Sequence, residues 1–349
     1  MKYSVVVPVF NRPDEVDELL QSLTNQTCKD FEVIIVEDGS SIPCGEVCKK
    51  YEERLKLRYF TKANSGPGQS RNYGAERAEG KYILVLDSDV VLPNGYLEAV
   101  DRSLYPSSQS SQENIAAFGG PDAAHPSFTN TQKAISYSMT SFFTTGGIRG
   151  GKKKLDKFYP RSFNMGIRAD VYKQVGGFSK MRFGEDIDFS YRIVEAGYQP
   201  VLIPEAWVWH KRRTDFRKFF RQVYNSGIAR INLEKRHPGT MKWVHLLPTV
   251  FTLGVLFLLA GCLTTTFLCL ASLVSPVIPL LFLTPIILYC LIIGIDSTLR
   301  NKSLTVGILS IPAAFVQLMG YGFGFIESWW KRCVLKQDEF TAFEKNFYQ

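Results

Sequence analysis

Two long stretches without a charged residue dominate the C-terminal third of this 349-residue chain. Residues 244–295 contain no Lys, Arg, Asp or Glu, and residues 303–326 are again uncharged. A helix needs about 20 mainly apolar residues to cross a bilayer. The sequence therefore predicts membrane helices near 246–270, 275–295 and 304–326, and it argues against a purely soluble protein.

The positive charge of the chain is concentrated just before these stretches, in a segment that we call the collar, residues 211–242. The whole chain has a formal net charge of +8, and within the collar ten basic residues face only Asp215 and Glu234, so the collar carries the entire surplus. A basic segment beside a membrane helix is typical of the cytoplasmic, lipid-facing side. Nucleic-acid binding is not expected, because the surplus does not extend over the globular part. The basic residues are Lys211, Arg212, Arg213, Arg217, Lys218, Arg221, Arg230, Lys235, Arg236 and Lys242.

Within the collar, apolar side chains recur with helical spacing over residues 215–231. The pattern, with Arg and Lys on the other face, is typical of an amphipathic helix in a membrane interface. A helix packed on the preceding domain would show the same spacing, and the coincidence with the basic surplus favours the interface. The residues at i, i+3, i+4, i+7 and i+8 are Phe216, Phe219, Phe220, Val223 and Tyr224.

The remaining charges leave the membrane topology open. The positive-inside rule places Arg300 and Lys302, between the second and third apolar segments, on the same side as the collar. Three full spans would then put Lys331, Arg332 and Lys336 on the opposite side, against that rule. Either the third segment is re-entrant or interfacial, or the chain violates the rule.

The first 243 residues alternate apolar runs with helical patterns. This alternation predicts an α/β fold, a mostly parallel sheet with helices on both faces. Ligands of such sheets bind beyond the carboxyl ends of the strands, where Asp38, Asp87 and Asp89 lie. Strands are expected at 4–9, 31–36, 57–60 and 82–86, helices from residue 13, after Gly68, at 169–174 and from Gly184 to about 197, and loops at 106–113, 118–121 and 144–154.

The cysteines indicate a reducing compartment rather than a disulfide framework. Seven cysteines show no paired pattern, and Cys44 and Cys48 have no second Cys or His pair at zinc spacing. Unpaired thiols suit an intracellular location.

Two acids follow the predicted strand at 82–86. Asp87 and Asp89 are hard oxygen ligands of the kind that Mg²⁺ or Mn²⁺ prefers. Such an ion neutralises the charge that develops on a diphosphate leaving group. Paired acids are also common in solvated turns. The position of this pair directly after a buried strand favours a metal site over a solvated turn. His210 is a candidate third ligand, although a packed histidine is the more common role.

Three further residues have two possible roles each. Asp38 ends a predicted strand and could bind a nucleobase or ribose, or it could shape a turn. Asp186, in the sequence GEDID, could act as a general base or cap a helix. Arg71, in NSGPGQSRNYG, could contact phosphate or belong to an ordinary helix start.

Together these segments resemble the family 2 glycosyltransferases, enzymes with the GT-A fold. The matching pieces are VVVPVFNRPDEVDELLQSL, EVIIVEDGS, NSGPGQSRNYGAERAEGKYILVLDSDV and SFNMGIRADVYKQVGGFSKMRFGEDIDFSYRIVEAGY, spread with gaps over residues 5–198. The resemblance implies a nucleotide-diphosphate-sugar donor, a divalent ion at Asp87 and Asp89, and inversion at the anomeric carbon. It also implies that Asp38 binds the nucleoside and that Pro8 and Asn11 lie beside the nucleobase.

The resemblance assigns the remaining site residues as well. It places Arg71 near the diphosphate and counts Asp87 and Asn164, of the SFNMGIR piece, among the donor-binding residues. Asp186 is implied as the catalytic base, with Glu185 beside it.

Two departures from the family pattern stand out. Glu37 occupies a position where the family often has Asp, and little effect is expected because Asp38 remains. Processive members carry Gln-x-x-Arg-Trp after the base, whereas this chain has Gln222-x-x-Asn225-Ser226. A non-processive enzyme is therefore expected.

The sequence as a whole predicts a metal-dependent (Mg²⁺ or Mn²⁺), inverting glycosyltransferase with a lipid-linked or glycan acceptor, active in surface polysaccharide or glycolipid synthesis. It is expected in an inner or plasma membrane, in contact with membrane lipids, with the catalytic domain in the cytoplasm. A non-catalytic nucleotide-sugar-binding scaffold is the alternative, and a transporter is disfavoured because the spans hold almost no ionisable residue. The expected parts are a GT-A domain at 1–210, an interfacial helix and linker at 211–243, a membrane region at 244–330 and a tail at 331–349.

Overall fold

The computed structural model describes residues 1–105, 115–125, 127–146, 158–211 and 213–342. The loop predicted at 106–113, most of the loop predicted at 144–154, and Arg212 of the collar lie outside the described residues.

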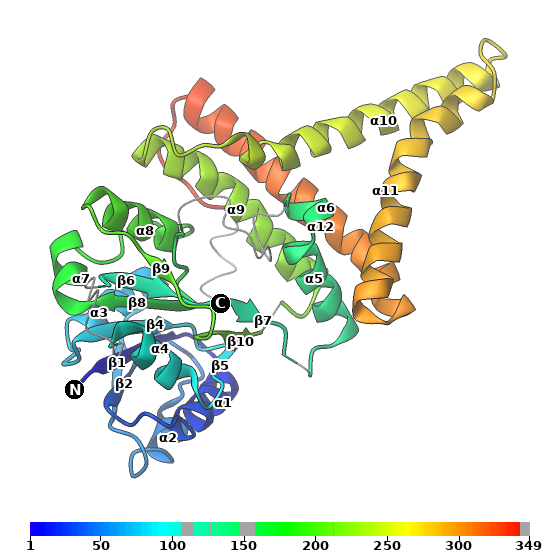
Figure 1. Cartoon of the computed structure of the whole chain (residues 1–349). Coiled ribbons are helices and arrows are strands. Elements are labelled where there is room, and N and C mark those ends of the chain that lie inside the picture. Colours follow the sequence, from blue (N-terminus) through cyan, green and yellow to red (C-terminus); the bar gives the residue numbers. More distant parts are fainter. Residues whose placement is uncertain (106–114, 126, 147–157, 212, 343–349) are drawn as a thin grey trace. The chain divides into compact units, whose positions relative to one another are not determined.

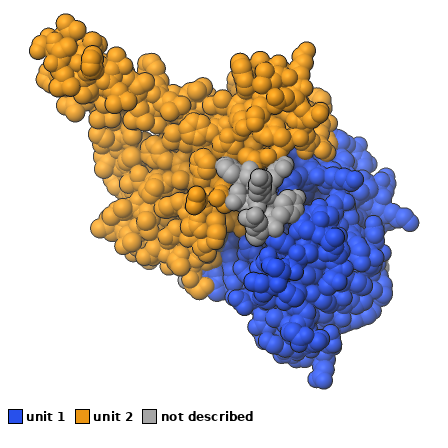
Figure 2. All heavy atoms as spheres, turned by 180° about the vertical axis from the view of Figure 1, so that it is seen from behind, with its two compact units in different colours: residues 1–125, 154–211, 348 blue, residues 126–153, 212–347, 349 orange. Residues whose placement is uncertain are grey.

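The chain folds into two compact units, which Figure 2 colours separately. Unit 1 comprises residues 1–125 and 154–211, and unit 2 comprises residues 126–153 and 212–347. The expected domain at 1–210 is therefore interrupted, since residues 126–153 belong with the C-terminal helices. One reason is a hydrogen bond of 2.6 Å from the Tyr137 hydroxyl to Asp296 Oδ2.

Unit 1 is built on a seven-stranded sheet with the order β3-β2-β1-β4-β8-β6-β9 (Figure 1). The pairs β1–β2, β2–β3, β1–β4 and β6–β9 are parallel, and only β8 runs against its neighbours. The predicted α/β class, with a mostly parallel sheet, is confirmed. The strands are β1 Tyr3–Val9, β2 Phe31–Asp38, β3 Leu57–Lys62, β4 Tyr82–Leu86, β6 Ala117–Gly119, β8 Asn164–Arg168 and β9 Val201–Leu202.

Helices cover both faces of this sheet because alternate residues of the buried strands point to opposite sides. Val5 and Val7 of β1 pack in a core with the first group of helices, whereas Val6 packs in a second core with the other group. The first group is α1 Pro13–Thr24, α2 Gly45–Lys49 and α4 Tyr96–Leu104, and the second is α3 Pro67–Ala75, α7 Ala169–Val175 and α8 Glu185–Glu195.

A second, three-stranded sheet extends unit 1 next to the end of β4. Its order is β5-β10-β7, with β5 Val90–Val91, β10 Val208–His210 and β7 Asp122–Ala123. The antiparallel register pairs His210 with Val90, which directly follows Asp89. This small sheet therefore brings residues from the end of unit 1 to the Asp87–Asp89 segment.

The four strands predicted at the N-terminus are confirmed to within two residues. Strand β6 overlaps the loop predicted at 118–121, and the sequence predicts no strand at the position of β8. Both are short, and their pairing depends on a close approach that no local pattern reveals. A Cβ added to Gly166 of β8 would lie 2.1 Å from the ring of Phe118 in β6. Glycine is required there because the aromatic ring occupies the space of a side chain.

Unit 2 is helical. Its helices are α5 Asn130–Thr140, α6 Phe142–Thr145, α9 Phe216–Arg236, α10 Leu247–Leu270, α11 Val277–Asn301 and α12 Leu304–Trp329, with a 3₁₀ turn at Trp243–His245 and a π-helical turn at Trp330–Val334. Three helical segments, Trp243–Leu270, Val277–Asn301 and Leu304–Val334, are long and apolar enough to cross a membrane. The predicted C-terminal helical region with apolar helices is therefore confirmed.

Helix α9 lies against α12 rather than presenting a free apolar face. Phe219, Val223 and Ile228 are buried, and the two backbones approach so closely that a Cβ on Gly227 would lie 2.1 Å from the Tyr321 carbonyl oxygen. The apolar face of this helix is therefore covered by protein, by α12 instead of the preceding domain, and the predicted interfacial position of the helix stays a prediction.

Candidate active site

The acids singled out by the sequence lie where elements of unit 1 begin or end. Asp38 is the last residue of β2, Asp87 follows β4, and Asp89 precedes β5. Glu185 and Asp186 open α8 after Gly184, whose φ of 83° lies in the left-handed region that favours glycine. In parallel sheets the carboxyl ends of the strands share one edge, so this edge is the expected ligand site.

Arg71 of α3 joins two of these acids. Its Nη2 lies 2.8 Å from Asp87 Oδ1, and its Nη1 lies 2.8 Å from Glu185 Oε1. The guanidinium is buried, and although burial lowers the pKa of Arg71, the two carboxylates outweigh it and raise the pKa above its ordinary value. Arg71 therefore holds the end of β4 and the start of α8 together, so that its guanidinium is engaged by carboxylates rather than open to a diphosphate.

The neighbours Glu185 and Asp186 are in different electrostatic states. Burial raises the pKa of Glu185, and Arg71 only partly opposes this rise. Burial also acts on Asp186, but Arg161, whose Nε lies 2.7 Å from Asp186 Oδ2, outweighs it and holds the pKa below the usual range. Asp186 also accepts a hydrogen bond of 2.9 Å from the Ile187 amide. Asp186 is thus an ionised carboxylate at neutral pH.

Asp87, Asp89 and His210 form a group that could hold a metal ion. One ligand atom of each lies within 4.8 Å of the others, and all three side chains are half-buried. His210 Nε2 is 3.3 Å from Asp89 Oδ1, and His210 Nδ1 is 3.9 Å from Asp122 Oδ2. Phe163 stacks on the imidazole with ring centroids 4.8 Å apart. Two carboxylates and an oriented imidazole fit Mg²⁺ or Mn²⁺, Mn²⁺ in particular, because imidazole suits a softer ion than Mg²⁺.

Asp38 shapes the turn before α3. Its Oδ1 lies 2.5 Å from Lys62 Nζ and accepts a hydrogen bond of 2.9 Å from the Ser65 amide, while its Oδ2 accepts one of 2.9 Å from the Gly66 amide. Both carboxylate oxygens are therefore bonded within the chain, as the turn-forming interpretation of Asp38 predicts.

Asn11 connects the end of β1 to the loop after β2. It has a positive φ of 54°, its amide donates to Ser40 Oγ at 2.7 Å, and its Oδ1 accepts from the Ile42 amide at 2.9 Å. Pro8, near the end of β1, is half-buried. Glu37 is buried and accepts a hydrogen bond of 2.7 Å from the Cys44 amide. Asn11 and Glu37 therefore fix the loop beside the ligand edge.

The side chain of Asn164 is hydrogen-bonded within unit 1. It is buried, its Oδ1 accepts from the Tyr96 hydroxyl at 2.6 Å, and its Nδ2 donates to the Ala206 carbonyl at 2.8 Å. The two bonds tie β8 and α4 to the segment before β10, and the donor-binding role of Asn164 stays a prediction.

Arg161 and Asp122 are site residues that the sequence did not reveal. Arg161 pairs with Asp186 across 25 positions of sequence, and Asp122 stands beside His210. The only available signal was the position of Arg161 at the start of the RSFNMGIR segment, and nothing in that segment points to Asp186.

Comparisons with known proteins agree with this picture of unit 1. Residues 4–174 match the family model described as Glycosyl transferase family 2. An uncharacterised glycosyltransferase of Rickettsia bellii is 40% identical over 97 residues, 28% of this chain and 14% of that protein. The poly(ribitol-phosphate) beta-N-acetylglucosaminyltransferase TarS of Staphylococcus aureus is 40% identical over 93 residues, 26% of this chain and 16% of that protein. The matches thus span only about a seventh of these relatives.

Among solved structures, the mannosyltransferase PcManGT from Pyrobaculum calidifontis, in complex with GDP-Man and Mn²⁺, has a TM-score of 0.62 at 16% identity. The likeness covers 95% of this chain and 88% of that one. At this identity the likeness concerns the fold, and the predicted GT-A fold is confirmed.

Proposed function

Because this chain belongs to glycosyl transferase family 2, we propose that it transfers a sugar from a nucleotide-diphosphate-sugar to an acceptor hydroxyl, with inversion at the anomeric carbon. The observation that carries this proposal is the chain of contacts from Asp87 through Arg71 to Glu185, next to Asp186. It links the candidate metal group to the candidate base. The complex of PcManGT with GDP-Man supports this class of donor.

Asp87, Asp89 and His210 are the proposed ligands of Mg²⁺ or Mn²⁺. When bound, such an ion neutralises charge on the diphosphate leaving group. The Phe163 ring and Asp122 orient His210 for this role. Asp38 acts indirectly in the proposed site, because it holds the turn at residues 64–66 that borders the donor edge.

Asp186 is the proposed general base. It takes the proton of the acceptor hydroxyl while that oxygen bonds to the anomeric carbon from the face opposite the diphosphate. The bond between the anomeric carbon and the diphosphate oxygen breaks, and the nucleoside diphosphate leaves with the electron pair. The Arg161 side chain is 41% exposed and can swing aside for the acceptor, which would raise the pKa of Asp186 and strengthen it as a base.

The proposed acceptor is lipid-linked, and the proposed process is surface polysaccharide or glycolipid synthesis. Three helices long and apolar enough to cross a membrane follow the basic collar in sequence, which supports a membrane acceptor and a cytoplasmic unit 1. The poly(ribitol-phosphate) polymer in the name of TarS supports the polysaccharide setting.

A non-processive transfer is proposed from the position of Asn225. Its Oδ1 accepts from the Ala342 amide at 2.9 Å, and its Nδ2 donates to the Ala342 carbonyl at 3.1 Å. This side chain fastens the C-terminal segment to α9, so the position where processive relatives carry arginine here has a structural role.

The test uses the full chain in membranes, a panel of nucleotide-sugars and extracted lipid acceptors, with release of nucleoside diphosphate as the readout, with and without Mn²⁺. Asp186→Asn should lower turnover by about 100-fold or more and leave nucleotide binding intact. The matched control is Asp170→Asn on α7, whose carboxylate is 64% exposed and which should retain activity.

Turnover that survives in Asp186→Asn would refute the base assignment. Nucleotide-sugar binding by the wild-type protein without turnover on any donor and acceptor would instead favour the non-catalytic scaffold.

A further inference from the structure

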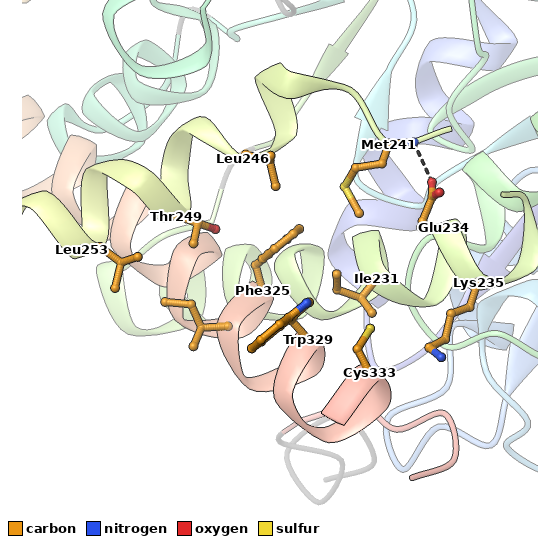
Figure 3. Close-up of a pocket in the computed structure, with 11 residues that line it drawn as sticks. Ile231, Glu234, Lys235, Met241, Leu246, Thr249, Leu253, Phe325, Trp329 and Cys333 are labelled. Atoms are coloured by element: carbon orange, nitrogen blue, oxygen red, sulfur yellow. Dashed lines mark hydrogen bonds between the residues drawn. The ribbon is translucent and has the colours of Figure 1, made fainter. Parts of the chain in front are cut away.

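The three apolar helices of unit 2 are not a simple series of crossings, because the first of them begins against the last. Leu246 and Thr249, at the start of α10, line one cavity of about 510 Å³ with Trp329 and Cys333, at the end of α12 (Figure 3). A Cβ added to Gly322 of α12 would lie 2.8 Å from the Pro248 carbonyl oxygen. The start of α10 and the C-terminal half of α12 therefore lie side by side.

The other end of α12 is fixed to the end of α11. Only Lys302 and Ser303 separate the two helices, and Ser297 Oγ lies 2.7 Å from Ser310 Oγ. The first turns of α12 therefore lie beside the last turns of α11, which carry Asp296 and Arg300.

Three full crossings do not fit these two contacts. In a three-span arrangement, α10 starts on the collar side, α11 ends on the collar side, and α12 leaves from there to the opposite face, about 30 Å away. Here both the first turns of α12 and its turns around Gly322 touch segments that belong on the collar side. Helix α12 consequently begins on that side and stays there.

The partner of α12 supports the same placement, because α9 runs parallel to it. Along this pair, Val223 meets Gly320, Ser328 Oγ donates to the Ile228 carbonyl at 3.2 Å, and Arg332 Nε donates to Asn232 Oδ1 at 3.1 Å. A membrane crossing by α12 would carry α9 with it. Helix α9 has exposed basic residues at both ends, Arg217, Lys218, Lys235 and Arg236. Charged side chains are costly at the centre of a bilayer, so this pair of helices is unsuited to cross it.

The hairpin formed by α10 and α11 is apolar where the α9–α12 pair is charged. A short turn at residues 271–276 joins the two helices into a hairpin (Figure 1). Within it, Gly261 lies against the ring of Phe282, and the turn is uncharged. Large apolar side chains are exposed along both helices, whereas residues 309–328 of α12 expose none. Exposed tryptophans, typical of a membrane interface, stand at the start of α10 and the end of α12: Trp243, Trp329 and Trp330.

We propose that the α10–α11 hairpin is the membrane-inserted element and that α12 lies along the interface with α9, so that the chain returns to the collar side. This inference rests on the membrane location in the proposed function and adds its topology. It also removes the conflict with the positive-inside rule, because Lys331 and Arg332 then face the same side as the collar.

The test is labelling with a membrane-impermeant maleimide in sealed vesicles of known orientation. Cys333 is exposed and serves as the C-terminal reporter in a variant whose other cysteines are alanine. Two matched variants, with Cys333 also replaced, carry Ser226→Cys on the exposed face of α9 or Ser272→Cys in the exposed α10–α11 turn. We expect Cys333 and S226C to be labelled in the same orientation, and S272C to remain unlabelled in that orientation.

Labelling of Cys333 only in the opposite orientation to S226C would overturn the proposal, as would labelling of S272C together with S226C. A second measurement avoids cysteine replacement altogether: an epitope after Gln349 of the wild-type chain should be cleaved by protease in the orientation that exposes unit 1. Protection of the epitope there would also overturn the proposal. Neither readout needs transfer activity, so a failed topology and a failed catalytic assignment are distinguishable.

Discussion

Replacement of Arg71 by methionine tests whether this residue positions the site, as its two ion pairs indicate. The substitution keeps a long apolar side chain on α3 and removes the guanidinium that joins Asp87 and Glu185. It leaves Glu185, whose side chain is 10% exposed, as a buried carboxylate without its cation.

The magnitude follows from this burial. Removing one partner of a buried ion pair destabilises a protein by about 3–5 kcal/mol, because the other charge is left uncompensated. For a folded unit of this size, each kcal/mol corresponds to about 2–4 °C in the melting temperature. We therefore expect Arg71→Met to lower the melting temperature of unit 1 by about 6–20 °C.

The assay is tryptophan fluorescence during heating of the full chain in detergent micelles. Arg168→Met is the matched control, since its partner Asp170 is 64% exposed and such pairs contribute about 0–1 kcal/mol. The double variant Arg71→Met with Glu185→Gln should recover part of the loss, because the buried charge is then gone.

The pH dependence gives a second check with a definite sign. The pKa of Glu185 is raised by burial, with Arg71 opposing, so removal of Arg71 raises it further. When the pKa of a carboxyl group is higher in the folded state than in the unfolded state, the protein becomes less stable as the pH rises above the unfolded-state pKa. The difference in melting temperature between the wild-type protein and Arg71→Met should therefore become smaller at acid pH. An unchanged melting temperature, or a deficit that grows toward acid pH, would refute the reasoning.

Three other outcomes are expected. Arg161→Gln should raise the pKa of Asp186, since the removed cation is what lowers it, so the acid limb of the kcat/KM profile should move to higher pH; a shift to lower pH would contradict the pairing. Asp89→Asn should raise the Mn²⁺ concentration for half-maximal turnover by at least about ten-fold, and an unchanged titration would exclude this carboxylate as a ligand. Gly324→Leu should destabilise unit 2 by about 1–3 kcal/mol or more in thermal unfolding, because its Cβ would meet a carbonyl oxygen at 2.0 Å, whereas Gly254→Leu, with nothing within 4 Å, should not.

The parts of the fold that depend on local patterns could be predicted from the sequence. The strands containing Val5 and Ile34 are short, mainly apolar runs rich in Val and Ile, and the sequence places them correctly because strands buried on both faces of a parallel sheet have this composition. The sequence places acids directly after such strands, and Asp87 and Asp89, which follow β4, each offer a ligand atom within 4.8 Å of the other and of His210.

The parts that depend on distant partners could not be predicted. Arg71 appeared free to bind phosphate because Glu185, its partner, lies 114 positions away. The SFNMGIR segment suggests that Asn164 binds the donor. Its hydrogen bonds to Tyr96 and Ala206, which lie far away in sequence, could not be predicted. The amphipathic spacing of α9 fits both a helix that faces lipid and a helix that packs on protein. Only the close approach of Gly227 in α9 to Tyr321, and of Gly324 in α12 to Tyr224, reveals that α12 covers this face.

The uncharged turn at residues 271–276 has a consequence for how unit 2 reaches its final state. A transmembrane voltage does about 2.3 kcal/mol of electrical work per 100 mV on each elementary charge that crosses. The tip of the α10–α11 hairpin carries none, so the insertion that we propose for it should not depend on the voltage across the membrane. Collapse of that voltage by an ionophore during synthesis should leave the hairpin inserted as before.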